Sequence, residues 1–177
     1  TNNANFSVGG SSKRGLAVDN RAILKSFVNN ASFKHTGSNS LIYVRGGGTI
    51  QNITNSGEMS IAGADQGWKS VIRLEDAGNL TGARVDAINF IGNSTTSNVN
   101  ASGTKWNVIS IGSATSSIGA ITARDNATIN GHFSFDQGTI GNITFQDSAR
   151  ITGNISLAGS SRISKILIDG SNSSGTN

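Results

Sequence analysis

The sequence predicts an all-β protein, a right-handed parallel β-solenoid (β-helix) built from strand-turn units of 11–12 residues. Three observations predict this fold. The composition favours strands and turns over long helices. Related apolar phrases recur at a nearly constant spacing in the last third of the chain. Within each phrase, apolar residues alternate with polar ones, as they do on a strand with one buried face.

The composition is polar and weakly charged. The 177 residues include 23 Gly, no Pro and no Cys, and 14% are charged, against about 25% in an average domain. Ser, Thr, Asn and Gly, which favour turns, take the place of charged residues. Apolar residues recur to the end of the chain, which argues against disorder. The absence of Pro suits stacked strands, because Pro removes a ladder hydrogen bond.

The repeat is clearest in five consecutive units. They begin at Ile118, Ile129, Ile140, Ile151 and Ile163, so the spacing is constant except for one extra position before the last unit. Each unit closes with an apolar-x-apolar pair: Ile121/Ala123, Phe133/Phe135, Ile143/Phe145, Ile155/Leu157 and Ile166/Ile168. A single unit holds one short strand and one turn, so it cannot bury its apolar face alone. Stacked parallel rungs of two units (about 22–23 residues) or three (about 34 residues) solve this problem. An antiparallel sandwich is the alternative, but it requires no constant register.

Turn residues link the units. Asp125, Asp136 and Asp147 recur in these links, each at the same position after the start of its unit. Because a carboxylate can accept hydrogen bonds from backbone N–H groups at a turn, we interpret them as turn residues. The alternative is a row of metal-binding or catalytic acids.

The pattern divides the chain into three parts. Residues 1–37 form an N-terminal tip and cap, in which DNRAILKSFVNN predicts a short capping helix or a strand. Residues 38–170 form the solenoid, with a projecting loop near 92–105 where the apolar pattern lapses. Residues 171–177 form a polar tail.

No catalytic, cofactor-binding or metal-binding residues are predicted, and the chain is interpreted as a non-enzyme. The catalytic motifs of common enzyme classes are absent. With only His35 and His132 and no Cys, a zinc site is not expected. The enzyme alternative is a polysaccharide-cleaving β-helix, which would need clustered acids such as the Asp row or the group Asp65, Glu75, Asp76 and Asp86. The scattered basic residues predict no nucleic-acid partner, and no apolar run is long enough for membrane insertion.

The phrases GTIQNIT, GTIGNIT and ITGNISLAG, the lack of Cys and the Gly/Asn/Ser/Thr-rich units resemble the passenger region of Gram-negative autotransporters and related β-helical adhesins over residues 40–170. The resemblance implies a parallel β-solenoid, export to the bacterial cell surface, and a role in adhesion, aggregation or presentation of a binding site.

We therefore expect an extracellular structural or adhesive segment whose partner is a protein or glycan of a host or neighbouring cell. The predicted contact region is the loop 93–104, because loops on rigid scaffolds often carry function. Trp68 and Trp106 each open an apolar unit and are interpreted as core residues rather than contacts. The second hypothesis is a self-assembling filament or homo-oligomer, joined end to end through an open edge at ISKILI.

Overall fold

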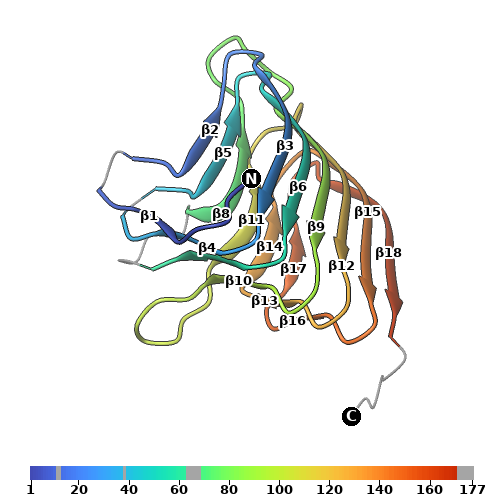
Figure 1. Cartoon of the computed structure of the whole chain (residues 1–177). Coiled ribbons are helices and arrows are strands. Elements are labelled where there is room, and N and C mark those ends of the chain that lie inside the picture. Colours follow the sequence, from blue (N-terminus) through green and yellow to red (C-terminus); the bar gives the residue numbers. More distant parts are fainter. Residues whose placement is uncertain (11–12, 38, 63–68, 171–177) are drawn as a thin grey trace.

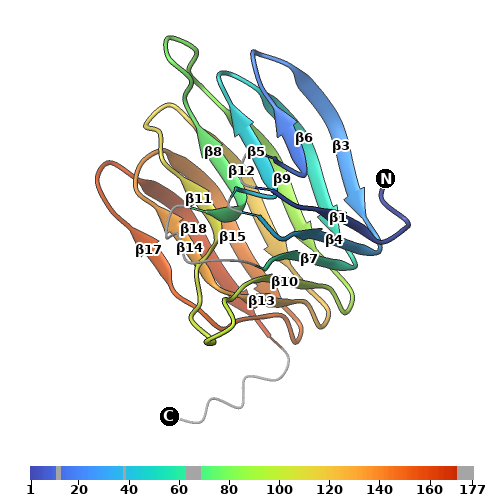
Figure 2. The ribbon, with the colours of Figure 1, turned by 90° about the vertical axis from the view of Figure 1, so that its left-hand side faces the viewer.

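The computed structural model describes residues 1–10, 13–37, 39–62 and 69–170. Every regular element in these ranges is a β-strand, and the strands form three six-stranded sheets. In Figure 1 the chain winds through the three sheets in turn, and Figure 2 shows the turns stacked from the first strands to the last. The described residues include no helix that is long and apolar enough to cross a bilayer.

Each sheet takes every third strand of the chain. Sheet A contains β3 (Ile23–Asn29), β6 (Thr49–Asn55), β9 (Arg84–Phe90), β12 (Ser117–Ala123), β15 (Thr139–Gln146) and β18 (Arg162–Asp169). Sheet B contains β1 (Phe6–Val8), β4 (Ser32–His35), β7 (Glu58–Ile61), β10 (Thr95–Asn98), β13 (Thr128–Asn130) and β16 (Arg150–Ile151). Sheet C contains β2 (Leu16–Val18), β5 (Ile42–Arg45), β8 (Ser70–Glu75), β11 (Asn107–Ile111), β14 (His132–Phe135) and β17 (Ile155–Leu157).

All pairs between these strands are parallel, so the chain is a parallel β-solenoid with three strands per rung, and the predicted fold class is confirmed. Late rungs are short: Asp125 and Asp147, at equivalent corners of neighbouring rungs, are 22 residues apart. Rungs in the middle of the chain are longer, since Asn93 and Asn126 at equivalent corners are 33 residues apart. The 11-residue unit is therefore half of a short rung. One unit forms a single long strand such as β12, and the next forms two short strands such as β13 and β14.

The core is a set of apolar columns that run along the stack. In sheet A, Ile53, Ile88, Ile121 and Ile143 lie in register and are almost completely buried. A second column contains Ile50, Val85, Ile118 and Ile140. Between these columns the strand register skips one residue in every rung, for example at Gly119 and Gly141. The strands of sheet A are therefore kinked, and their buried residues follow a three-then-two spacing.

The N-terminal part corrects two predictions. The segment DNRAILKSFVNN forms a turn and strand β3, so of the two predicted alternatives the strand is confirmed and the capping helix is wrong. Leu24 and Phe27 face inward, and their three-residue spacing imitated a helix because the strand is kinked between them. Strands β1 to β4 also pair in register with strands of the following rungs, so these strands belong to the solenoid rather than to a separate cap. The predicted tail, 171–177, lies outside the described residues.

Candidate functional site

The outer face of sheet A is a broad surface of small neutral side chains. Sheet A holds the longest strands, up to eight residues, and its outward side chains lie in registered columns. Three rows consist of Thr, Ser, Asn and Ala: Thr49/Asn52/Thr54 on β6, Ser117/Ala120/Thr122 on β12 and Thr139/Asn142/Thr144 on β15. All nine are half-buried or exposed. Their hydroxyl and amide groups are fixed on a rigid frame with a spacing between neighbouring rungs of about 4.8 Å.

Side-chain hydrogen bonds order part of this face. Asn89 on β9 donates through Nδ2 to Asn52 Oδ1 at 2.8 Å, and Asn52 Nδ2 donates to Thr54 Oγ1 at 3.2 Å. The charged groups on the central rows are confined to β9, where Arg84 pairs with Asp86. This pair lies between the β6 row and the β12 row. The adjacent rows on β12 and β15 carry no charged group, so they can exchange hydrogen bonds with a neutral polar ligand without first removing charged groups from water.

A compact charged cluster lies on the outer side of sheet C. The Tyr43 hydroxyl and the Arg73 guanidinium both donate to the Glu75 carboxylate. Arg45 Nε donates to Asp19 Oδ2 at 2.6 Å, and the Arg14 guanidinium lies 4.3 Å from the centre of the Tyr43 ring. These contacts join residues from three successive rungs, so the cluster links β2, β5 and β8 across the sheet.

Hydrogen bonding sets the protonation of this cluster. Burial opposes ionisation of Glu75, but the hydrogen bonds from Arg73 and Tyr43 outweigh it and lower the pKa of Glu75. Asp19 behaves in the same way: burial opposes ionisation, and the Arg45 contact brings its pKa below the usual value. Burial and the bond to Glu75 raise the pKa of Tyr43. The acids are therefore held as carboxylates and the phenol is held protonated. This pattern supports a structural role rather than proton transfer at neutral pH.

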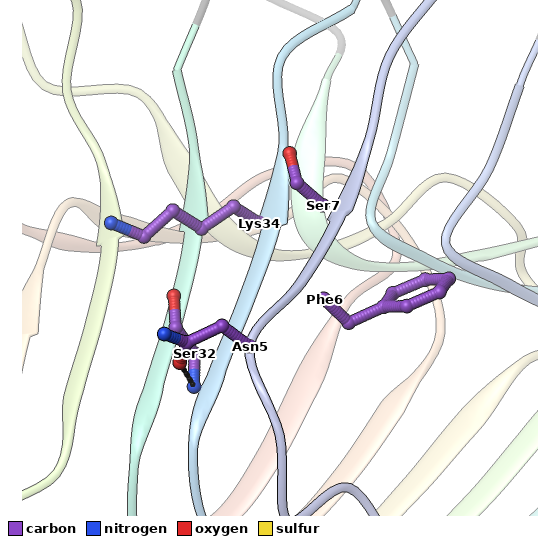
Figure 3. A pocket seen from close by; sticks show the side chains of 5 residues that line it. All are labelled: Asn5, Phe6, Ser7, Ser32 and Lys34. Atoms are coloured by element: carbon purple, nitrogen blue, oxygen red, sulfur yellow. Dashed lines mark hydrogen bonds between the residues drawn. The ribbon is translucent and has the colours of Figure 1, made fainter.

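A shallow hollow of about 240 Å³ lies beside β1 and β4, lined by Asn5, Phe6, Ser7, Ser32 and Lys34 (Figure 3). Lys34 Nζ lies 3.0 Å from Glu58 Oε2, and Ser60 Oγ donates to Glu58 Oε1 at 3.1 Å. The ammonium and carboxylate therefore already neutralise each other at the wall of the hollow.

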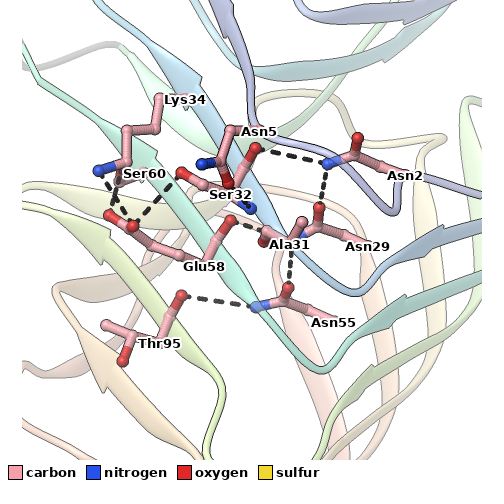
Figure 4. Close-up of polar contacts among 10 residues, drawn as sticks. All are labelled: Asn2, Asn5, Asn29, Ala31, Ser32, Lys34, Asn55, Glu58, Ser60 and Thr95. Atoms are coloured by element: carbon pink, nitrogen blue, oxygen red, sulfur yellow. Dashed lines mark hydrogen bonds and ion pairs between the residues drawn. The ribbon is translucent and has the colours of Figure 1, made fainter.

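A ladder of amides lies next to this hollow, at the start of the stack (Figure 4). Asn2 Nδ2 donates to Asn29 Oδ1 at 2.6 Å, Asn29 Nδ2 donates to Asn55 Oδ1 at 2.7 Å, and Asn55 Nδ2 donates to Thr96 Oγ1 at 3.0 Å. Asn29 and Asn55 are completely buried. The ladder satisfies polar groups inside the solenoid and is therefore structural.

The structure does not bring the three regularly spaced Asp residues together. Asp125 and Asp147 lie at the corner between sheets A and B, whereas Asp136 follows β14 at a different corner. Asp125 Oδ2 accepts a hydrogen bond from Gly92 N–H at 2.8 Å, and Asp147 Oδ2 accepts one from Asp125 N–H at 3.0 Å. Both residues have positive φ angles of 61° and 57°, so these two carboxylates stabilise tight turns of neighbouring rungs.

The second acidic group is also dispersed. Glu75 belongs to the cluster on sheet C, Asp76 accepts a hydrogen bond from Thr115 Oγ1, and Asp86 lies on sheet A. Asp65 lies outside the described residues. The part of the chain that the structure describes contains no group of three potential metal ligands.

Both histidine side chains form hydrogen bonds with backbone groups through both ring nitrogens. The Nδ1 atom of His35 accepts a hydrogen bond from Gly37 N–H, so Nε2 carries the proton that is donated to the Lys13 carbonyl at 2.7 Å. His132 has the same arrangement with Asn154 N–H and the Lys105 carbonyl. Trp106 is half-buried, and Trp68 lies outside the described residues.

The predicted loop 93–104 is smaller in the structure. Residues 95–98 form strand β10, which pairs with β7 and β13, so the prediction of a loop from 92 to 105 is wrong at this point. The projecting part is the hairpin tip between the bridged residues Val99 and Lys105. Asn100 Oδ1 accepts hydrogen bonds from the N–H groups of Ser102 and Thr104, so the tip is ordered by its own amide. It extends away from the stack in Figure 1.

Comparisons with known proteins return no matching family model, no matching curated protein and no matching solved structure. The family resemblance therefore remains a hypothesis based on the residues. Sequence reasoning missed the cluster on sheet C. The alternating residues of IYVR and SVIRLE were the available signal, but their register depends on a rung length that varies along the chain.

Proposed function

We propose that this protein is an extracellular structural and adhesive scaffold, which presents the outer face of sheet A to a neutral glycan or polysaccharide of a host or neighbouring cell. The observation that supports the proposal most is the set of three registered rows of small neutral side chains on one rigid sheet, all of them polar except Ala120. A sugar chain offers hydroxyl groups as donors and acceptors along an extended ligand. A fixed array of Thr, Ser and Asn can exchange hydrogen bonds with many of them at a small cost in ordering.

The other surfaces support this role less well. The charges of the hollow at β1 and of the cluster on sheet C already neutralise one another. The described acids of the enzyme alternative lie in separate contacts or turns. The hairpin tip is a second contact candidate on the same scaffold, because all of residues 101–104 are exposed.

The test is binding of the labelled chain to an array of neutral glycans. Thr122→Lys places a charge at the centre of the face, and we expect it to weaken binding by about tenfold or more, because the ammonium group must be partly desolvated. Ser134→Lys is the matched control, since Ser134 is also a half-buried, outward residue in register with its neighbours but lies on sheet C. Equal loss from both variants would contradict the assignment to sheet A.

A hairpin variant separates the two contact candidates. Replacing residues 100–104 by Asn-Gly shortens the tip and keeps β10 and the Val99–Lys105 bridge. We expect this variant to bind as the unmodified chain does. Loss of binding in it alone would move the contact from sheet A to the tip.

A further inference from the structure

The two ends of the solenoid differ in how they are covered. Among the described residues, the large apolar side chains that are exposed lie in the first and last rungs: Phe6, Ile23, Leu157, Ile166, Leu167 and Ile168. At the N-terminal end, Asn2 pairs with Asn29, and the rings of Phe6 and Phe27 lie 5.7 and 5.3 Å from that of Phe33. This end therefore partly covers itself.

Strand β18 is an edge strand of sheet A, and among the described residues only β15 pairs with it. Ile166 and Ile168 belong to the buried columns, opposite Ile143 and Phe145, yet they are 47% and 75% exposed because no described rung follows them. Leu167 on the outer side is 38% exposed. An edge strand with three consecutive exposed apolar residues is a site for pairing with another strand.

The backbone of β18 defines which groups are free. The Asp169 carbonyl accepts a hydrogen bond from Asp147 N–H of the preceding rung, so the Asp169 backbone faces β15. Because backbone groups alternate in direction along a strand, Leu167 also faces β15, whereas the N–H and C=O groups of Ile166 and Ile168 face the free edge. The outward side chains of this segment are Lys165, Leu167 and Asp169, in register with Asn142, Thr144 and Gln146.

The segment Lys165-Ile166-Leu167-Ile168-Asp169 is complementary to itself when it is read in the opposite direction. We propose that β18 pairs antiparallel with β18 of a second copy, with Leu167 opposite Leu167. In this register Ile166 and Ile168 of the two copies face each other as hydrogen-bonded pairs, and these are the residues whose backbone groups are free. On the outer side, each Lys165 lies opposite Asp169 of the other copy. Opposite charges at such positions stabilise a pair of strands, and like charges destabilise it.

Head-to-tail pairing has less support. A parallel pair between β18 and β3 of a second copy would place Lys165 opposite Ser26, with no opposite charge, if the existing register continued. Asn2 also already pairs with the end of β3, through hydrogen bonds between its backbone and those of Val28 and Asn30. The antiparallel contact is isologous and closes on itself, so it gives a dimer rather than a filament.

Charge exchange tests the pairing. Molar mass is measured by sedimentation over a series of concentrations for the full chain and for three variants: Lys165→Asp, Asp169→Lys and the double variant. We expect the unmodified chain to dimerise and each single variant to raise the dimer dissociation constant by about tenfold or more, because two attractive pairs become two repulsive ones. The double variant restores opposite charges at both pairs and regains dimerisation. A monomer at every concentration, single variants that dimerise normally, or a double variant as weak as the single ones would overturn the proposal.

A disulfide tests the register. In a non-hydrogen-bonded antiparallel pair the Cα atoms lie about 4.5 Å apart, which a disulfide can bridge. The chain has no Cys, so Leu167→Cys introduces a unique thiol. We expect a covalent dimer on mild oxidation. Thr144→Cys, in the same outward column one rung earlier, is the matched control and stays monomeric. Equal cross-linking of the two variants, no cross-linking of Leu167→Cys, or fibres in place of dimers would refute the antiparallel pair.

Discussion

The apolar columns predict a large difference between two chemically identical substitutions. Ile143 and Ile166 lie in the same column in neighbouring rungs. Ile143 is completely buried, whereas Ile166 is 47% exposed in the single chain. Replacing either residue by Ala removes three carbon atoms, so only the surroundings of the two side chains differ.

The magnitudes follow from burial. Three buried carbons contribute about 2.4 kcal/mol at about 0.8 kcal/mol each, and a cavity that cannot collapse adds about 1 kcal/mol. Ile143→Ala therefore lowers the free energy of unfolding by about 3.5 kcal/mol. At Ile166 roughly half of the transfer energy applies and no closed cavity forms, so Ile166→Ala lowers it by about 1 kcal/mol.

The assay is urea unfolding followed by far-ultraviolet circular dichroism at a protein concentration too low for dimerisation. The slope against urea concentration should stay unchanged, so that a shift of the midpoint reports stability. Equal losses at the two positions would refute the reasoning, because they would mean that a further layer covers Ile166 or that Ile143 does not lie in a closed column.

Three further outcomes follow from the packing and hydrogen bonds of the stacked rungs. A Cβ atom on Gly141 would overlap the Gly119 carbonyl oxygen, so Gly141→Ala should cost about 1–3 kcal/mol in urea unfolding, while Gly112→Ala, whose Cβ has only ordinary contacts, should cost less. Asn55→Ala removes the central amide of the buried ladder and should cost about 1–3 kcal/mol; an unchanged midpoint would contradict the ladder. The lowered pKa of Glu75 contributes stability that is complete above its ordinary value of 4.5 and is lost as the pH falls through the folded-state value. The free energy of unfolding of Glu75→Gln should therefore fall less steeply on acidification than that of the unmodified chain. An identical fall in the two proteins below pH 4.5 would contradict this.

The fold could be predicted because the residues of each buried column recur at a regular spacing in the sequence. Ile118, Ile140 and Ile163 open alternate units and lie in register on sheet A, and Ile129 and Ile151 open the others and lie in register on sheet B. Few folds other than a stack of parallel rungs can bury the apolar faces of short strands that recur at a constant spacing. The parallel pairing was therefore predictable in the last rungs, where the spacing varies by a single residue.

The number of strands per rung was harder to predict, because the position of a single glycine decides whether a unit forms one strand or is divided by a corner into two. In IGAITA and IGNITF the glycine is the second residue, and the unit forms one kinked strand. In INGHFSF and ITGNISL the glycine is the third residue, and it separates two short strands. Gly131 makes this corner with a φ angle of 142°, which favours glycine. The position of glycine was thus a readable signal for the corner.

The candidate surfaces were less predictable because rung length varies. Equivalent corner residues of neighbouring rungs are 33 residues apart at Asn93 and Asn126 but only 22 residues apart at Asp125 and Asp147. The spacing in a single sequence does not reveal how much of a long rung is insertion, so the outward rows of sheet A could not be aligned. Tyr43 and Glu75, which meet on sheet C, are 32 residues apart. Such contacts follow from pairing across rungs rather than from local pattern.

The proposed dimer and the proposed binding face are geometrically compatible. Antiparallel pairing through β18 would extend sheet A from one copy into the other, and the two-fold axis would stand perpendicular to the sheet. An axis in that direction leaves the outer face of sheet A pointing outward in both copies. Both sets of Thr, Ser and Asn rows would then lie on the same side of one continuous sheet. A polysaccharide long enough to cross the β18 pair would meet two copies of the same face, so its second contact would be intramolecular and its release slower. Lys165 and Asp169 would in that case act on glycan binding without touching the glycan, through the pairing of the two edges.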